Sequence, residues 1–196
     1  MHLNSRFKLP GFKLHSMMLF PLALLTCTSA FPAGSTSLGS NDAQRCYQES
    51  LFPFSDQGIG YCNNAILRGD LTRKNLAATY SNRGIIHSKN GKFEKALADH
   101  NKAIRLKPDI PEVHINRGNV LYLTHEYEEA LTEFDKAIAT NAGLTATALF
   151  NKALTLLTLH RLDDAKVTLE TALEVDPDSK IIEKALINIT SLREPS

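Results

Sequence analysis

The sequence has no tryptophan, only three cysteines among 196 residues, and no apolar run long enough to span a membrane. It also lacks a glycine-rich phosphate-binding loop, a nucleophile elbow and a histidine pair at metal-binding spacing on one helix. The 22 basic and 21 acidic residues nearly balance, so there is no cationic surplus for a nucleic acid. These absences argue against an enzyme, a cofactor, a metal site and a nucleic-acid partner. Binding of another protein is the leading functional class.

The first thirty residues differ from the rest, because the first 41 positions contain no acidic residue. Basic residues precede the apolar run "MMLFPLALL" (17–25), and small residues follow it up to Ala30. This order is typical of a secretory signal peptide. We therefore predict a signal peptide over 1–30, cleaved after Ala30, and an exported protein that is most simply placed in a bacterial periplasm.

The same segment allows a second interpretation. The stretch "LLTC" (24–27) resembles the lipid-attachment motif of bacterial lipoproteins, although Thr26 stands where that motif has Gly, Ala or Ser. A lipid on Cys27 would tether the protein to a membrane, where it would act as an assembly or structural factor. Lipidation is the alternative to simple cleavage, and it is the only route to a membrane that the sequence suggests.

Removal of residues 1–30 changes the charge and the cysteine count. Three basic residues and no acidic ones are lost, so the remaining chain carries 19 − 21 = −2. Cys46 and Cys62 are then the only cysteines. An even pair in an exported chain is most simply a disulfide.

From about residue 43 the sequence has helical periodicity, and no stretch alternates as a strand does. The preceding residues 31–42, "FPAGSTSLGSND", are predicted to be a flexible leader. Small residues then recur about every 34 positions, which lets paired helices approach closely, and prolines stop the second helix of a pair. The recurring columns are Gly84, Gly118 and Ala153; Ala96, Ala130 and Ala165; Ala103, Ala137 and Ala172; and Pro108 with Pro177.

This spacing resembles the tetratricopeptide repeat family. The resemblance covers rows 77–110, 111–145 and 146–179, and it implies an all-α fold, a right-handed superhelical array of antiparallel helix pairs (an α-solenoid). Residues 43–76 are interpreted as a degenerate first helical pair carrying the disulfide. Residues 180–196 are interpreted as a capping helix and a tail.

Basic residues stand in a column that the family usually fills with leucine. Two of them have an acid 16 residues later: Arg83 has Asp99, and Arg117 has Glu133. We predict that both pairs clasp the two helices of their hairpin. The third row departs from this pattern, because Lys152 stands opposite Thr168.

In this family the first helices of the pairs line a concave groove that binds peptides. The resemblance therefore implies a groove that binds a segment of another protein, whose identity stays open. Recognition of an acidic tail is not expected, because Lys89 is nearly the only cation on that face. Asparagine is common in this family at the repeat position that Asn82, Asn116 and Asn151 occupy, so these three residues can mark the fold rather than a ligand. The residues assigned to the groove are Asn82, Asn116, Asn151, Asn119, Lys89, Tyr122, Ile115, Phe150 and Leu154, with Ser81 beside them.

Three histidines lie around one repeat junction, where the family has aromatic residues. We predict that His87, His100 and His114 are packed neutral rings rather than metal ligands. Row 77–110 is basic and the next two rows are acidic, which allows head-to-tail self-association. Ion pairs on a solvated surface are the favoured explanation of this pattern.

Overall fold

The computed structural model describes residues 41–52, 56–140 and 143–191, and every regular element within these ranges is an α-helix. The predicted signal peptide with Cys27, the leader up to residue 40, and the tail from residue 192 lie outside the described residues. The elements are α2 (Asn41–Leu51), α3 (Asp56–Arg68), α4 (Arg73–Lys89), α5 (Phe93–Leu106), α6 (Pro111–Leu123), α7 (Tyr127–Ala139), α8 (Thr145–Thr158), α9 (Leu162–Val175) and α10 (Lys180–Ser191).

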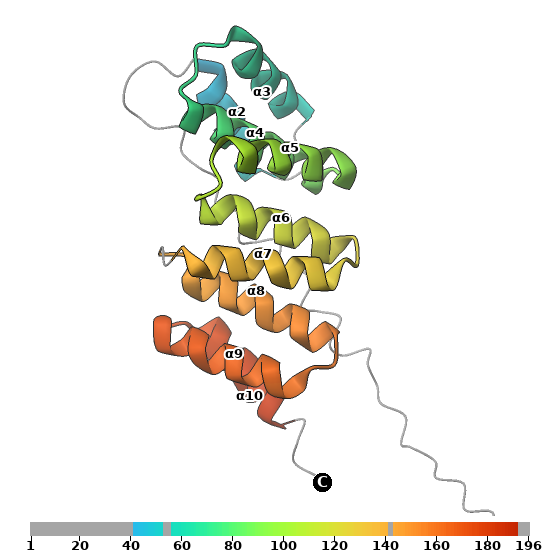
Figure 1. The fold of residues 1–196 in the computed structure, drawn as a ribbon, viewed down its shortest axis with the longest axis vertical. Coiled ribbons are helices and arrows are strands. Elements are labelled where there is room, and N and C mark those ends of the chain that lie inside the picture. The colour runs from blue at the N-terminus through green and yellow to red at the C-terminus, as the bar shows by residue number, and fades with distance from the viewer. Residues whose placement is uncertain (1–40, 53–55, 141–142, 192–196) are drawn as a thin grey trace, which may run out of the picture.

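The helices pair in sequence order and stack into one elongated array (Figure 1). The hairpins are α2–α3, α4–α5, α6–α7 and α8–α9, and α10 packs on α9 at the far end. The predicted fold, an all-α solenoid of helix pairs, is confirmed. No helix in the described ranges is both long enough and apolar enough to cross a bilayer.

The helix limits differ slightly from the predicted rows. Helix α2 begins at Asn41, inside the segment assigned to the leader. Helix α4 begins at Arg73, four residues before the predicted row, because the Thr72 side chain accepts a hydrogen bond from the amide of Asn75 and caps the helix. Pro111 opens α6 at its first turn, where proline costs no intrahelical bond.

Each regular hairpin turns through one residue with a left-handed backbone. In the first this residue is Gly91 (φ 69°), and in the next two it is His125 (φ 67°) and His160 (φ 59°). Glycine adopts this conformation without a steric penalty, whereas a histidine does so at a cost of about 1 kcal/mol. The turns of the second and third hairpins are therefore strained relative to the first.

The first helices of the pairs form an inner row. Helix α4 contacts both α2 and α6, and α6 contacts α8, whereas the second helices α5, α7 and α9 approach one another less closely. The array is consequently concave along α2, α4, α6 and α8.

Small residues of the repeat columns make up the interface within and between pairs. They are almost without exposed surface, and large side chains pack against them. Pro108 and Pro177, by contrast, are exposed and follow the ends of α5 and α9. The buried small residues are Gly84, Gly118, Ala96, Ala103, Ala130, Ala137, Ala153, Ala165 and Ala172.

Candidate functional site

The three asparagines at equivalent repeat positions, which we call the asparagine column, are buried between the packed helices rather than exposed on the inner row of α4, α6 and α8. Asn82, Asn116 and Asn151 are 1%, 3% and 0% exposed. Asn151 Nδ2 donates to Asn119 Oδ1 across the α6–α8 joint at 2.9 Å. Within the described residues, Asn116 Nδ2 and Asn151 Oδ1 are buried without a hydrogen-bond partner. Such atoms cost free energy and call for an explanation.

Three apolar residues assigned to the groove belong to the core, which corrects the prediction. Ile115 is fully buried and clusters with Ala137 and Ala148. Phe150 and Leu154 are 7% and 6% exposed and join the C-terminal core cluster. The inner helices pack closely enough to cover these side chains, so little apolar surface remains for a ligand there.

Lys89, the one cation expected in the groove, is engaged within the molecule. Its Nζ donates to the carbonyl oxygens of Ser50 at 2.7 Å and Phe52 at 3.4 Å, at the end of α2. A cation is favourable at a helix C-terminus. Burial lowers the pKa of Lys89. Lys89 therefore binds α2 to α4 and is not available to an acidic ligand.

The partly exposed residues beside the asparagine column form a polar row, which we define as Asn119, Tyr122 and Thr158. Tyr122 OH lies 3.0 Å from Thr158 Oγ1, which links α6 to α8 a second time. Amide and hydroxyl groups both donate and accept hydrogen bonds. This row can satisfy a peptide backbone without reading its side chains.

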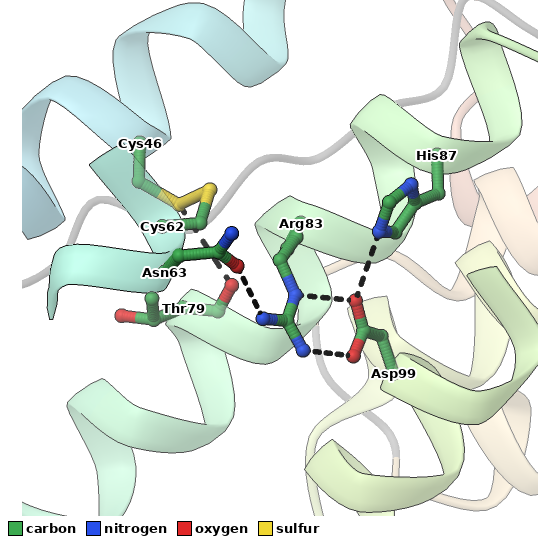
Figure 2. Close-up of polar contacts among 7 residues, drawn as sticks. All are labelled: Cys46, Cys62, Asn63, Thr79, Arg83, His87 and Asp99. Carbon is green, nitrogen blue, oxygen red and sulfur yellow. Dashed lines mark hydrogen bonds and ion pairs between the residues drawn. A yellow bond between two sulfur atoms is a disulfide. The ribbon is translucent and has the colours of Figure 1, made fainter. Parts of the chain in front are cut away.

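Arg83 clasps its hairpin and also reaches the preceding one (Figure 2). Its Nε and Nη2 donate to Asp99 Oδ2 and Oδ1 at 2.8 and 2.6 Å, and its Nη1 donates to Asn63 Oδ1 at 2.6 Å. His87 Nε2 stands 3.8 Å from the same carboxylate. The arginine thus connects α3, α4 and α5. The contact with Asn63 was not predicted from the sequence.

Glu133 is the centre of a second, more deeply buried cluster. It is 2% exposed, and it pairs with Arg117 Nη1 at 2.8 Å, Lys136 Nζ at 2.7 Å and His114 Nδ1 at 2.7 Å. Burial raises the pKa of Glu133, but hydrogen bonds from His114 and Lys136 and the charge of Arg117 outweigh it and lower the pKa to about 2.

His114 is a buried ring with two hydrogen-bond partners that were not predicted from the sequence. Its Nδ1 meets the carboxylate of Glu133, and its Nε2 lies 2.8 Å from the carbonyl oxygen of Pro108. Both partners only accept hydrogen bonds, so the ring donates to both at once only when it is protonated. His114 therefore connects α6 to Glu133 of α7 and to the residues that follow α5.

His100 is a fully buried ring that packs against Gly84. Neither ring nitrogen has a hydrogen-bond partner among the described residues. Burial, with a smaller effect of the Arg117 charge, lowers the pKa of His100 to about 3. The equivalent pair in the next repeat is Phe134 against Gly118.

We expect His100→Phe to stabilise the protein, and to do so more strongly at low pH. The unfolded chain binds a proton at His100 near pH 6.5 and the folded chain only near pH 3, so wild-type stability is lost as the pH falls below 6.5. The advantage of the variant should grow by about 2 kcal/mol between pH 8 and pH 5 in urea unfolding. The reciprocal variant Phe134→His should show the opposite trend. A difference that is independent of pH would contradict this prediction.

The third hairpin lacks a clasp of its own. Lys152 Nζ lies 2.6 Å from Asp135 Oδ1 on α7, and Thr168 occupies the place of the acid on α9. Asn63 follows Cys62 in "CNNAI" (62–66), and Asp135 follows Phe134 in "FDKAI" (134–138). The likeness of these two stretches is the sequence signal that would have revealed the partners of the basic residues on the preceding hairpin.

A disulfide joins α2 to α3. Cys46 and Cys62 are bonded, with Cα atoms 4.8 Å apart, and both are fully buried. Cys46 Sγ also lies 3.8 Å from the carbonyl oxygen of Thr79 on α4 (Figure 2). The bond holds the first hairpin closed where it packs on the regular repeats.

Removal of this bond should destabilise the first hairpin selectively. A bond closing a loop of 16 residues contributes roughly 3 kcal/mol by restricting the unfolded chain. In the double variant Cys46→Ala/Cys62→Ala, amide hydrogen exchange should become faster in α2 and α3 while α6–α9 keep their rates. Equal acceleration along all helices would show that the first hairpin supports the whole array.

No group of three or more His, Cys, Asp or Glu side chains that could hold a metal ion occurs in the described part of the chain. The polar groups that the structure does bring together serve two purposes. The ion pairs connect helices, and the polar row with its neighbouring asparagines lies along the concave face. This arrangement can bind a chain segment.

Two models of the tetratricopeptide repeat match the sequence, over residues 77–110 and 109–178, which together exceed half of the chain. Among solved structures, the chain is similar to MamA (41 to the end) from Desulfovibrio magneticus RS-1, with 16% identity and a TM-score of 0.63 over 80% of this chain and 88% of that one. It is also similar to the second tetratricopeptide domain of human RPAP3, in complex with the HSP70 peptide SGPTIEEVD, with 24% identity and a TM-score of 0.56.

That match covers 61% of this chain and 98% of the RPAP3 domain. The first tetratricopeptide domain of Spaghetti (RPAP3), bound to the HSP90 peptide SRMEEVD, matches with 22% identity and a TM-score of 0.55, over 59% of this chain and 91% of that one. These structural likenesses concern the fold. Together with the repeat models and the helix pairs, they lead to one assignment: the chain belongs to the tetratricopeptide repeat family.

Proposed function

We propose that this protein is a non-enzymatic scaffold that holds a segment of another protein on its concave face. The observation that carries the proposal is the polar row Asn119, Tyr122 and Thr158 at the α6–α8 joint. The amide and hydroxyl groups of this partly exposed row can exchange hydrogen bonds with a peptide backbone.

The similarity to domains solved with bound peptides supports this proposal. Those peptides end in several acidic residues, whereas Lys89 of this chain is occupied by the end of α2. The partner segment is therefore expected to differ from an acidic tail. Its backbone would be held by amides and hydroxyls, and its side chains would contribute little charge pairing.

We further propose that the protein acts outside the cytoplasm. The signal-like segment 1–30 and the Cys46–Cys62 bond support an oxidising compartment. Intact mass of the protein purified from the cell envelope tests this: a chain starting at Phe31 is the expected product. A chain starting at a diacylated Cys27 would favour the lipoprotein alternative, and an unprocessed chain would exclude both.

Site-specific photo-cross-linking tests the groove. A benzoylphenylalanine at position 122 replaces one aromatic residue by another, and a second at Ala98, an exposed position on α5, serves as the matched control. We expect partner adducts from position 122 and none from position 98. Adducts from position 98 alone would move the binding surface to the outer row, and the absence of adducts at both would reject the scaffold function.

A further inference from the structure

The loops that join successive hairpins lie along one side of the array, as the α5–α6 loop does on the left of Figure 1. Helices α3 and α5 end on this side, and α2, α4 and α6 begin there. Arg68 of α3 pairs with Asp42 of α2. Ala77 of α4 clusters with Ala103 of α5 and Val113 of α6. We call the N-terminal part of this side the loop edge, which comprises residues 41–43, 67–75 and 102–112.

Four exposed cations of the loop edge have no partner within the described part of the chain. Arg73 and Lys74 begin α4, and Lys102 and Arg105 lie near the end of α5. Most cations elsewhere in the array are engaged, since they form an ion pair, a hydrogen bond or a ring contact. Among the described residues, the lysines and arginines that form none of these are Arg73, Lys74, Lys95, Lys102, Arg105, Lys180 and Lys184.

The acids of the loop edge offset these four cations only in part. Asp42 and Asp109 each face a further cation of their own. Asp70 and Glu112 remain, so the surplus is 4 − 2 = +2. Farther along the same side the balance is reversed, because residues 174–180 contain three acids and one lysine. The positive charge is therefore confined to the N-terminal part of this side.

Two further features of the loop edge point to a membrane as its neighbour. Leu67, at the end of α3, is 83% exposed, more than any other large apolar side chain in the described ranges. Helix α2 begins at Asn41 on the same edge, so residues 1–40 join the array there. An uncleaved apolar run 17–25, or a lipid on Cys27, would hold this edge close to a bilayer. Cations around an exposed apolar residue suit the headgroup region of an anionic membrane.

We propose that the loop edge binds the surface of a membrane that contains anionic phospholipids. The four cations would contact lipid phosphates, and the Leu67 side chain would enter the interfacial layer. Because helices begin and end at this edge, the array would stand on the membrane by its helix ends. The concave face would stay open to a partner, so this site is independent of the proposed scaffold function.

Flotation with lipid vesicles tests the proposal. The chain from Phe31, the processed form expected above, is used because the apolar run 17–25 would itself bind lipid. The vesicles contain phosphatidylcholine alone or with an equal part of phosphatidylglycerol. We expect the protein to float with the anionic vesicles, to bind the neutral ones at least about tenfold more weakly, and to be released by about 0.5 M NaCl.

Two double variants of the α4–α5 hairpin form a matched pair. Lys74→Glu/Arg105→Glu should weaken binding to the anionic vesicles by at least about tenfold, because each cation near such a surface contributes about fivefold. Lys92→Glu/Lys95→Glu makes the same change of charge at the opposite end of the hairpin and should leave binding within about twofold. Leu67→Asn should weaken binding by about threefold. Circular dichroism confirms that each variant is folded.

A folded wild-type chain that does not float with the anionic vesicles overturns the proposal and leaves an acidic protein as the partner of these cations. Equal binding to neutral vesicles also overturns it, as does an equal loss in the two double variants, which would reflect general charge. A larger loss in Lys92→Glu/Lys95→Glu would move the contact to the opposite edge, where Leu51 and Phe52 are exposed.

Discussion

Gly118→Leu is expected to lower the free energy of unfolding by at least about 3 kcal/mol, or to prevent the second repeat from folding. A Cβ atom at this position would stand 2.6 Å from Phe134 Cε1 and 3.0 Å from two further ring atoms. That ring is fully buried, so it cannot move into solvent. Helices α6 and α7 would have to separate. Urea unfolding monitored by circular dichroism measures the loss.

Gly60 of α3 provides the control, because a Cβ added there meets no atom within 4 Å. Gly60→Ala should be neutral or stabilise α3 by up to about 1 kcal/mol, as a helical glycine replaced by alanine does. Adding Phe134→Ala to Gly118→Leu should restore part of the lost stability. A melting temperature unchanged by Gly118→Leu would show that the repeat columns are aligned wrongly.

Glu133→Gln should cost about 3 kcal/mol, although the change is nearly isosteric. The glutamine amide cannot neutralise the charges of Arg117 and Lys136, and it is a weaker hydrogen-bond acceptor for the buried His114. The exposed Glu129 on the same helix is the control. Glu129→Gln should change stability by less than about 0.5 kcal/mol. Equal effects of both variants would mean that the cluster is dispensable.

The pH dependence separates this cluster from His100. The unfolded chain protonates Glu133 near pH 4.5 and the folded chain only near pH 2. The stability that it contributes is therefore present above pH 4.5 and lost as the pH falls towards 2. The Glu133→Gln variant lacks this part of the acid unfolding curve. Its loss of stability between pH 6.5 and pH 4.5, which includes that due to His100, should resemble that of the wild type.

The interactions inside one hairpin follow from the sequence, because a fixed separation joins the two helices. The Arg83–Asp99 and Arg117–Glu133 pairs share a separation of 16 residues, and the structure contains both. The small residue at Gly84 likewise points to a large neighbour on the second helix, which is His100. Such contacts depend on the packing of the two helices within a hairpin, which is similar from one repeat to the next.

Contacts between hairpins could not be predicted in the same way. The burial of Ile115 depends on how tightly successive inner helices pack, and no residue pattern encodes that distance. Lys89 bonds to carbonyl groups, and His114 bonds to the carbonyl of Pro108, so backbone atoms without any sequence signature decide both positions. The groove surface was accordingly predicted less well than the repeats that form it.

The contacts between successive helix pairs also have a mechanical consequence. In the described part of the chain, each helix pair packs mainly on its neighbours along the array, and most of these contacts join the second helix of one pair to the first helix of the next. Widening one interface between helix pairs should therefore disturb that interface and leave distant pairs intact. At the α6–α8 interface, the Asn119–Asn151 and Tyr122–Thr158 hydrogen bonds hold the two inner helices together. A chain segment that replaced these two bonds would bend the array at the α6–α8 interface. The repeats on either side would then change their relative orientation while each kept its own packing.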